Sequence, residues 1–276
     1  MTYPRLSFIG AGNMARSLIG GLIADGYPAE QIRVSDPSPD QLTALAKHCR
    51  VQSGTDNIAA ARDADALILA VKPQVLHDVA VQLSEVVAQN KTLVISIAAG
   101  IRESDIDRWL GGKAAAIVRA MPNTPALIQC GATALYANAQ VTQEQRDLAE
   151  SVLRAVGLTL WLNDEALMDT ITAVSGSGPA YFLLVMEILQ SVGTELGLDA
   201  GSARLLTLQT AFGAAKMALE SPDDPATLRE RVTSPGGTTE QAIRVLEEGG
   251  LNALISEAVR AARDRSEELA NQLGRS

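Results

Sequence analysis

The chain has 276 residues, 47% of them apolar, which allows a large core and predicts two domains. Its net charge is −9 and it has no basic cluster, so nucleic acid and anionic membrane surfaces are poor partners. No apolar run is expected to reach transmembrane length, and the chain enters a strand-like run without a signal peptide; we therefore expect a cytoplasmic protein.

Strand-like and helical runs alternate over the first 163 residues. The segments predicted to form strands are 6–9, 32–36, 65–73, 92–100, 115–121, 132–138 and 158–163. Helical spacing follows most of them, as in 13–24, 39–49 and 141–156. This alternation predicts a Rossmann-type doubly wound α/β domain over residues 1–163, with right-handed crossovers.

After residue 164 the pattern contains helical runs only, which predicts an all-α domain over residues 164–276. The runs are 166–174, 179–196, 202–219, 225–232, 239–248 and 252–269. The run 179–196 is apolar on nearly every face and is expected to be buried all round. In so small a domain this favours packing against a second subunit, and so a dimer or larger; a monomer whose helices bury each other is the alternative.

The two cysteines, Cys49 and Cys130, show neither metal-ligand nor disulfide spacing. We therefore predict no metal site and a reducing compartment. Both are expected to be buried as small apolar side chains.

A glycine motif lies between the first predicted strand and helix. It reads Gly10, Ala11, Gly12, Asn13, Met14 and Ala15, which matches G-x-G-x-x-A. Gly10 permits the tight turn, Gly12 lets the backbone approach a pyrophosphate, and Ala15 allows close helix–strand packing. This context predicts dinucleotide binding, against the alternative of a purely structural turn.

The end of the second predicted strand bears on the choice of cofactor. Asp36 stands where an acidic residue holds the ribose 2′-OH of NAD and repels a 2′-phosphate. Alternatively, Asp36 faces water from a proline-rich turn and Ser35 helps bind a phosphate. Local chemistry alone favours NADH slightly.

Further cofactor contacts are expected at the carboxyl ends of the strands, where ligands bind in open α/β sheets. The candidates are Ile9, Ala70, Val71, Lys72, Pro73, Ala98, Ala99 and Asn123, with Asn57 on the adenosine side. Small side chains at 98 and 99 would let a cofactor pass close to the chain. An ordinary connecting loop is the alternative for each.

The helical domain offers few acids for proton transfer. Reducing a ketone creates an alkoxide that needs a proton donor, whereas hydride addition to a protonated imine gives a neutral amine. His48 and His77 fall in the first domain, and the helical domain has a single lysine, Lys216. An imine substrate is therefore favoured. A hydroxyacid dehydrogenase with Lys216 as acid is the rival, although a solvated Lys216 is more common.

Residues 232–250 read "VTSPGGTTEQAIRVLEEGG". Two glycines and two threonines precede an amphipathic helical run, which gives a helix N-terminus with little side-chain cover. Such a turn is suited to binding an anion.

Eight sequence blocks together resemble the pyrroline-5-carboxylate reductase family over almost the whole chain. In order, they are "FIGAGNMA", "AVKP", "SIAAG", "RAMPNTPAL", "GATALYAN", "VSGSGPAY", "FGAAKMALE" and the block at 232–250. The resemblance implies reduction of 1-pyrroline-5-carboxylate to L-proline with NAD(P)H, the last step of proline biosynthesis. It also implies a helical dimerisation domain, dimers that assemble into a decamer, and an active site completed by the partner subunit.

The resemblance also assigns roles to residues. It implies that the substrate carboxylate is bound by Ser234, Gly236 and the backbone N–H groups of Gly237, Thr238 and Thr239. The Thr239 hydroxyl would hydrogen-bond the ring nitrogen, which makes it the candidate catalytic group; an N-cap is its alternative role. Ser177 would lie near the substrate, and Lys72 and Asn123 near the cofactor.

Asp36 departs from the family pattern, because many members prefer NADPH and carry Ser, Thr, Asn or Arg there. We expect NADP(H) or NAD(H), with NADPH slightly first on the weight of the family. A reductase of another cyclic imine would share the fold. A non-enzymatic NADPH-sensing protein would not need the turn at 234–239.

Overall fold

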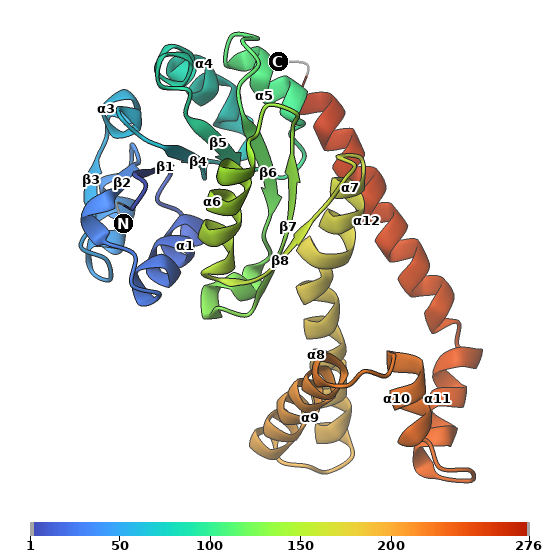
Figure 1. The fold of residues 1–276 in the computed structure, drawn as a ribbon. Coiled ribbons are helices and arrows are strands. Elements are labelled where there is room, and N and C mark those ends of the chain that lie inside the picture. The colour runs from blue at the N-terminus through green and yellow to red at the C-terminus, as the bar shows by residue number, and fades with distance from the viewer. Residues whose placement is uncertain (1–2, 275–276) are drawn as a thin grey trace. The chain divides into compact units, whose positions relative to one another are not determined.

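The computed structural model describes residues 3–274, which form two compact units (Figure 1). The sheet unit contains the chain up to Ser177 and returns at Ala262; the helical unit is Gly178–Ala261. The C-terminal helix therefore begins in the helical unit and ends in the sheet unit.

The sheet unit is built on one eight-stranded sheet in the order β3-β2-β1-β4-β5-β6-β7-β8. Its strands are β1 Leu6–Ile9, β2 Ile32–Ser35, β3 Gln52–Gly54, β4 Ala66–Leu69, β5 Leu93–Ser96, β6 Ile117–Met121, β7 Gly131–Ala137 and β8 Gly157–Trp161. Neighbours are parallel except for β6 and β7, which pair antiparallel. The first six strands have the dinucleotide-binding order, which confirms the predicted Rossmann-type class.

Helices cover both faces of this sheet (Figure 1). They are α1 Asn13–Ala24, α2 Pro39–Ala46, α3 Asn57–Ala61, α4 Pro73–Asn90, α5 Glu103–Trp109, α6 Gln143–Arg154 and α7 Leu167–Ile171, with short turns at Ala29–Gln31 and Thr124–Ile128. Alternate strand residues face opposite layers: Phe8 and Ile68 pack with α1 and α6, whereas Leu67 and Leu69 pack with α3, α4 and α5.

Two short elements between β2 and β4 were not predicted. All three residues of β3 are exposed, so this edge strand carries no hydrophobic pattern. Helix α3 has five residues, and Asp56 caps it by accepting the N–H groups of Ile58 and Ala59 at 2.9 and 3.0 Å. Local capping, rather than apolar periodicity, defines this helix.

The helical unit contains helices and no strand within its described residues, as predicted. Its helices are α8 Gly178–Glu195, α9 Ala200–Glu220, α10 Pro225–Arg231, α11 Thr238–Glu248 and the first part of α12 Leu251–Leu273. The expectation that 179–196 is buried all round is wrong for a single chain, because Gly178 is the one buried residue of α8. Phe182 and Leu183 are 70% and 61% exposed.

The same region corrects the expectation that no run reaches transmembrane length. The continuous helical stretch Leu167–Glu195 has 29 residues and contains an 18-residue window with a mean hydropathy of 1.3, enough to cross a membrane by length and composition alone. One such helix is weak support for a membrane span, since helices that pack in soluble proteins meet the same criteria.

The expectation that both cysteines are buried is half right: Cys49 is buried, but Cys130 is exposed.

The last turns of α12 are attached to the sheet unit by side chains of both. The Ser266 hydroxyl donates to the Asp169 carboxylate at 2.6 Å, and Arg102 donates to the Asn271 side-chain oxygen at 2.8 Å. Ala270 is 3% exposed. This end of α12 is therefore part of the sheet unit's packing.

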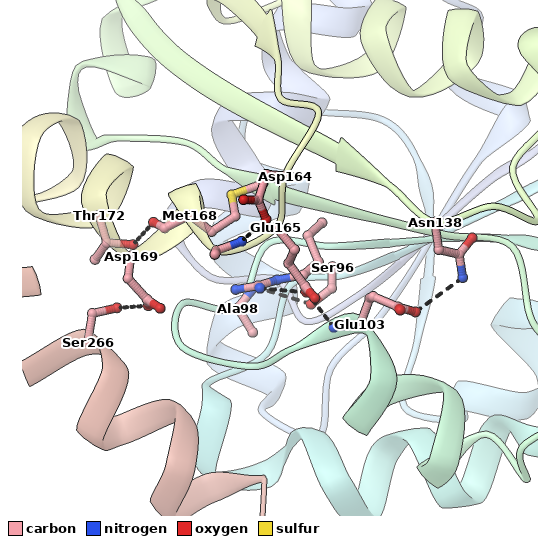
Figure 2. Close-up of polar contacts among 12 residues, drawn as sticks. Ser96, Ala98, Glu103, Asn138, Asp164, Glu165, Met168, Asp169, Thr172 and Ser266 are labelled. Carbon is pink, nitrogen blue, oxygen red and sulfur yellow. Dashed lines mark hydrogen bonds and ion pairs between the residues drawn. The ribbon is translucent and has the colours of Figure 1, made fainter. Parts of the chain in front are cut away.

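A polar network joins Glu165, two residues before α7, to the start of α5 and to Asn138 (Figure 2). Glu165 accepts the Glu103 backbone N–H and the Arg119 guanidinium, each at 2.7 Å. The Arg119 side chain is only 9% exposed. Burial raises the pKa of Glu103, against the opposing effect of the hydrogen bond that Asn138 donates to its carboxylate at 3.3 Å, and the charge of Glu165 raises it further. Glu165 thus satisfies a buried cation and the first N–H of α5 together.

Replacing Glu165 with Ala should destabilise the protein by about 3–5 kcal/mol, because a nearly buried Arg119 would lose its counter-ion. Urea unfolding at one fixed protein concentration measures this loss. Glu247→Ala is the control, since Glu247 pairs with Arg229 on the surface and its loss should cost less than about 1 kcal/mol. Equal losses for the two variants would contradict the assigned role of Glu165.

Candidate functional site

The turn after β1 depends on glycine at position 10. Gly10 has φ of +102°, and a Cβ there would lie 2.5 Å from the carbonyl oxygen of Ala70. Its N–H donates to the Ser35 carbonyl at 2.7 Å. The turn is therefore fitted between the ends of β2 and β4, and a side chain at this position would force them apart.

Helix α1 begins with exposed hydrogen-bond donors. Its N-cap is Gly12, and no side chain of the described residues caps it. A Cβ on Gly12 would meet no atom within 4 Å, so open space lies in front of the helix. Free N–H groups and the positive end of the helix dipole favour a pyrophosphate here. The observed geometry fits the dinucleotide that the sequence motif predicts.

Asp36 is directed at the glycine turn. One carboxylate oxygen accepts the Ala11 N–H and the other accepts the Ser38 N–H, both at 2.8 Å. The side chain is half-buried. Ser35 is fully buried, and within residues 3–274 its hydroxyl has no hydrogen-bond partner. Its backbone carbonyl, rather than its hydroxyl, supports the turn.

The sheet brings most of the other predicted cofactor residues to one edge. Strands β1, β4 and β5 are parallel, so residues that follow them lie at the same end of the sheet. These residues are Ala70, Val71, Lys72, Pro73, Ala98 and Ala99. Lys72 is exposed and is the N-cap of α4, with Pro73 at its first position. Asn57 begins α3, and its amide donates to Gln82 at 2.9 Å.

A π-helical turn at Thr172–Gly176 was not predicted. The Asn123 amide donates to the carbonyl and hydroxyl oxygens of Ser175 at 3.2 and 3.3 Å. Its side-chain oxygen accepts the Ala132 N–H at 2.9 Å. Asn123 therefore fixes the turn that precedes Ser177 against the end of β6. The glycine-rich run in the sequence was a signal for an unusual helical turn.

The second candidate anion site belongs to the helical unit. Gly237 is the N-cap of α11 and has no side-chain cap from the described residues. Gly236 has φ of +72°, which favours glycine. The Gly237 N–H donates to the Ser234 carbonyl at 2.9 Å, and the Gly236 N–H donates to Glu240 at 2.8 Å. Thr238 and Thr239 are the first two residues of α11, so their N–H groups have no acceptor within the helix.

The alternative role of Thr239 as N-cap is wrong, because Gly237 occupies that place and Thr239 is the second residue of the helix. Lys216 lies in α9 with 54% of its side chain exposed, and it forms an ion pair with Glu220 one turn later. His48 is exposed, and His77 is half-exposed and contacts Asp78 at 2.9 Å. These positions fit the solvated role expected for Lys216 and the solvated or structural roles expected for the two histidines.

The open N-terminus of α1, placed at the carboxyl edge of a parallel sheet, is the arrangement of a dinucleotide-binding oxidoreductase. Comparison with known protein families supports the assignment to this class. Residues 5–100 match the family model "NADP oxidoreductase coenzyme F420-dependent", and residues 165–269 match "Pyrroline-5-carboxylate reductase dimerisation".

Relatives that match nearly the whole chain define the family within this class of oxidoreductases. A pyrroline-5-carboxylate reductase of Pseudomonas aeruginosa is 52% identical over 99% of this chain and 100% of its own. The solved structure of one from Coxiella burnetii is 48% identical, with a TM-score of 0.92 over 98% of this chain and 99% of its own. An NADP-bound Plasmodium falciparum structure is 28% identical, with a TM-score of 0.87 over 98% and 99% of the two chains. The chain belongs to the pyrroline-5-carboxylate reductase family.

The two glycines of the turn should respond differently to alanine. Gly10→Ala should cost about 2 kcal/mol or more, because its Cβ meets the Ala70 carbonyl and its φ is positive. Gly12→Ala should keep a nearly unchanged Tm, since φ is −67° and the space is open. Its methyl group would nevertheless occupy the dinucleotide's place and raise the Kd for NADH or NADPH at least about tenfold.

Thermal unfolding and nucleotide fluorescence titrations measure the two effects. A Gly12→Ala protein that binds nucleotide as tightly as the unsubstituted chain would show that the cofactor lies elsewhere.

Proposed function

We propose that this chain reduces 1-pyrroline-5-carboxylate to L-proline with NAD(P)H, the last step of proline biosynthesis. The observation that carries the proposal is the glycine N-cap of α11, which offers an anion-binding helix N-terminus separate from the nucleotide cradle at α1. A substrate with its own carboxylate accounts for this second site. Family membership supplies the identity of the substrate.

The substrate carboxylate is bound by the turn at Ser234–Thr239. Gly236 and Gly237 add no side chain of their own to the approach, although the Glu240 carboxylate accepts the Gly236 N–H and must leave it if Gly236 is to bind the substrate. The N–H groups of Thr238 and Thr239 donate to the substrate carboxylate. The Gly237 N–H already donates to Ser234, so this bond must loosen if Gly237 is to join them. The dipole of α11 adds about 1 kcal/mol of attraction.

Thr239 is the candidate catalytic residue. Its hydroxyl orients the ring nitrogen of the imine, and Ser177 lies near the substrate in the same proposal. A protonated imine is already an electrophile, so hydride addition yields a neutral amine without a strong side-chain acid. Positioning and oriented N–H dipoles are therefore the main contributions of these residues.

The cofactor is held by the motif Gly10–Ala15 together with the segments after β2, β3, β4, β5 and β6. The residues proposed for contact are Ile9, Gly10, Ala11, Gly12, Asn13, Met14, Ala15, Ser35, Asp36, Asn57, Ala70, Val71, Lys72, Pro73, Ala98, Ala99 and Asn123. When bound, the reduced nicotinamide supplies the hydride. The family and its NADP-bound Plasmodium falciparum member support NADPH, while the carboxylate of Asp36 supports NADH.

Self-association completes the proposal. Residues 164–276 serve as the dimerisation and substrate-binding domain and residues 1–163 as the nucleotide-binding domain, with dimers assembling into a decamer in the cytoplasm. Dimerisation accounts for the exposed apolar side chains of α8 better than a membrane does, because α9 is also rich in exposed leucines, such as Leu205 at 67%.

The first experiment follows the absorbance of NADH or NADPH after addition of pyrroline-5-carboxylate, with proline measured as product. Rapid loss with either cofactor supports the proposal. No loss in protein that binds nucleotide would favour another cyclic imine. A hydroxyacid dehydrogenase would require Lys216, so full activity of Lys216→Ala would exclude that rival.

Thr239→Ala should lower kcat at least about tenfold, because the hydroxyl that orients the imine nitrogen is lost. The Kd for the reduced cofactor should change less than about twofold. Thr239→Ser is the matched control and should keep most of the activity, since it retains a hydroxyl. If Ser and Ala lower kcat equally, the hydroxyl does not act on the substrate.

Placing carboxylates on α8 should weaken self-association. Phe182 and Leu189 are 70% and 55% exposed, and Phe182→Glu with Leu189→Glu would put two charges on a surface proposed to be buried between subunits. Analytical ultracentrifugation should show a smaller species than the unsubstituted chain. Val81→Glu on α4, 49% exposed, is the control and should leave the mass unchanged. An unchanged mass for the α8 variant would place the interface elsewhere.

A further inference from the structure

We infer that Asp36 makes this chain prefer NADH to NADPH. The inference rests on the proposed function and goes beyond it by naming which nicotinamide nucleotide the site selects. Its basis is the arrangement of hydrogen-bond donors around the end of β2.

The Asp36 carboxylate is fixed at the ribose side of the cradle. Its two oxygens accept the N–H groups of Ala11 and Ser38, one at the glycine turn and one at the start of α2. The Asp36 N–H donates to the Gly54 carbonyl at 3.1 Å, so the residue is also tied to β3. An ionised carboxylate has about four acceptor positions, which leaves two for ribose hydroxyls. The side chain is thus held ready to accept the 2′-OH.

Donors for a 2′-phosphate are few in the same loop. Pro37 and Pro39 have no N–H, and the Ser38 N–H is already donated to Asp36. The Ser35 hydroxyl, a candidate phosphate ligand, is fully buried. No lysine or arginine in the described part of the chain forms an ion pair with Asp36. A 2′-phosphate would therefore meet a carboxylate without a cation between them.

Arg16 is the cation to consider as a rival phosphate ligand. Its guanidinium donates to the side-chain oxygens of Gln41, at 3.0 Å, and Asn13. Both contacts are with neutral amides, so the guanidinium would have to leave them to reach a 2′-phosphate. Among the described residues it forms no ion pair with Asp36.

The experiment measures NADH and NADPH side by side in two ways. Fluorescence titration without substrate gives the two Kd values, and initial rates with pyrroline-5-carboxylate give the two kcat/KM values. We expect a Kd for NADH at least about tenfold below that for NADPH, and the same order in kcat/KM. Equal or tighter binding of NADPH would overturn the inference.

Two substitutions and a control assign the preference to Asp36. Asp36→Ser and Asp36→Asn should each shift the Kd ratio toward NADPH by at least about tenfold. Asn keeps a side-chain oxygen that can accept the Ala11 N–H. The Asn variant therefore separates the effect of the lost charge from any loosening of the turn caused by Ser. Asp40→Asn removes the same charge from the exposed first turn of α2 and should change the ratio less than about twofold. A ratio in both Asp36 variants no different from that in the control would overturn the inference.

The experiment can contradict the proposed cofactor preference without contradicting the proposed function, and the reverse. If pyrroline-5-carboxylate is reduced faster with NADPH, the function stands and the cofactor inference is wrong. If neither cofactor is oxidised by pyrroline-5-carboxylate while NADH still binds more tightly, the inference stands and the proposed substrate is wrong.

Discussion

The close approach of Gly10 to the end of β4 is the constraint on which the nucleotide cradle depends. A Cβ at this position would lie 2.5 Å from the Ala70 carbonyl, and the Gly10 N–H bonds the Ser35 carbonyl. The turn is thus anchored to the strands on both sides of β1. Because the next residues start α1, this anchoring also sets where the first N–H groups of the helix point. In the proposed site, the position of the pyrophosphate would follow from a contact made entirely by backbone.

Both proposed anion sites use helices that begin with glycine. Five other helices are capped by side chains: Ser38, Asp56, Thr142, Asp199 and Asp224 each accept N–H groups at a helix N-terminus. Helices α4, α5 and α7 also lack a side-chain cap among the described residues, but the residue at that place is not glycine. Helices α1 and α11 have glycine at this place and no side-chain cap from the described residues. Leaving those N–H groups unpaired costs helix stability, about 1 kcal/mol for a lost cap. That cost is offset when a ligand's anionic group takes the place of the cap.

Much of this arrangement follows from sequence, and the exceptions have physical causes. Apolar runs and the glycine motif predicted seven of the eight strands and the sheet class, because buried parallel strands are nearly all apolar. Strand β3 was not predicted, because all its residues are exposed and carry no apolar pattern. The π-helical turn at Thr172–Gly176 was not predicted, because it is held by a side chain distant in the sequence, Asn123. The burial expected for 179–196 failed because a single chain does not supply the surface that covers it. The bond between Asp36 and the Ala11 N–H was equally beyond a sequence pattern, since it links residues 25 positions apart.

Asp36 also shows why nucleotide preference and nucleotide affinity are coupled in this fold. The carboxylate that would repel a 2′-phosphate is the same group that accepts the Ala11 N–H. Removing its charge therefore also removes, or weakens, a support of the glycine turn. A chain without this carboxylate would have to secure the Ala11 N–H by another acceptor. A single exchange at the end of β2 is thus expected to lower the affinity for both nucleotides while it shifts the preference, and residues of the turn or of α2 would have to change to restore that affinity.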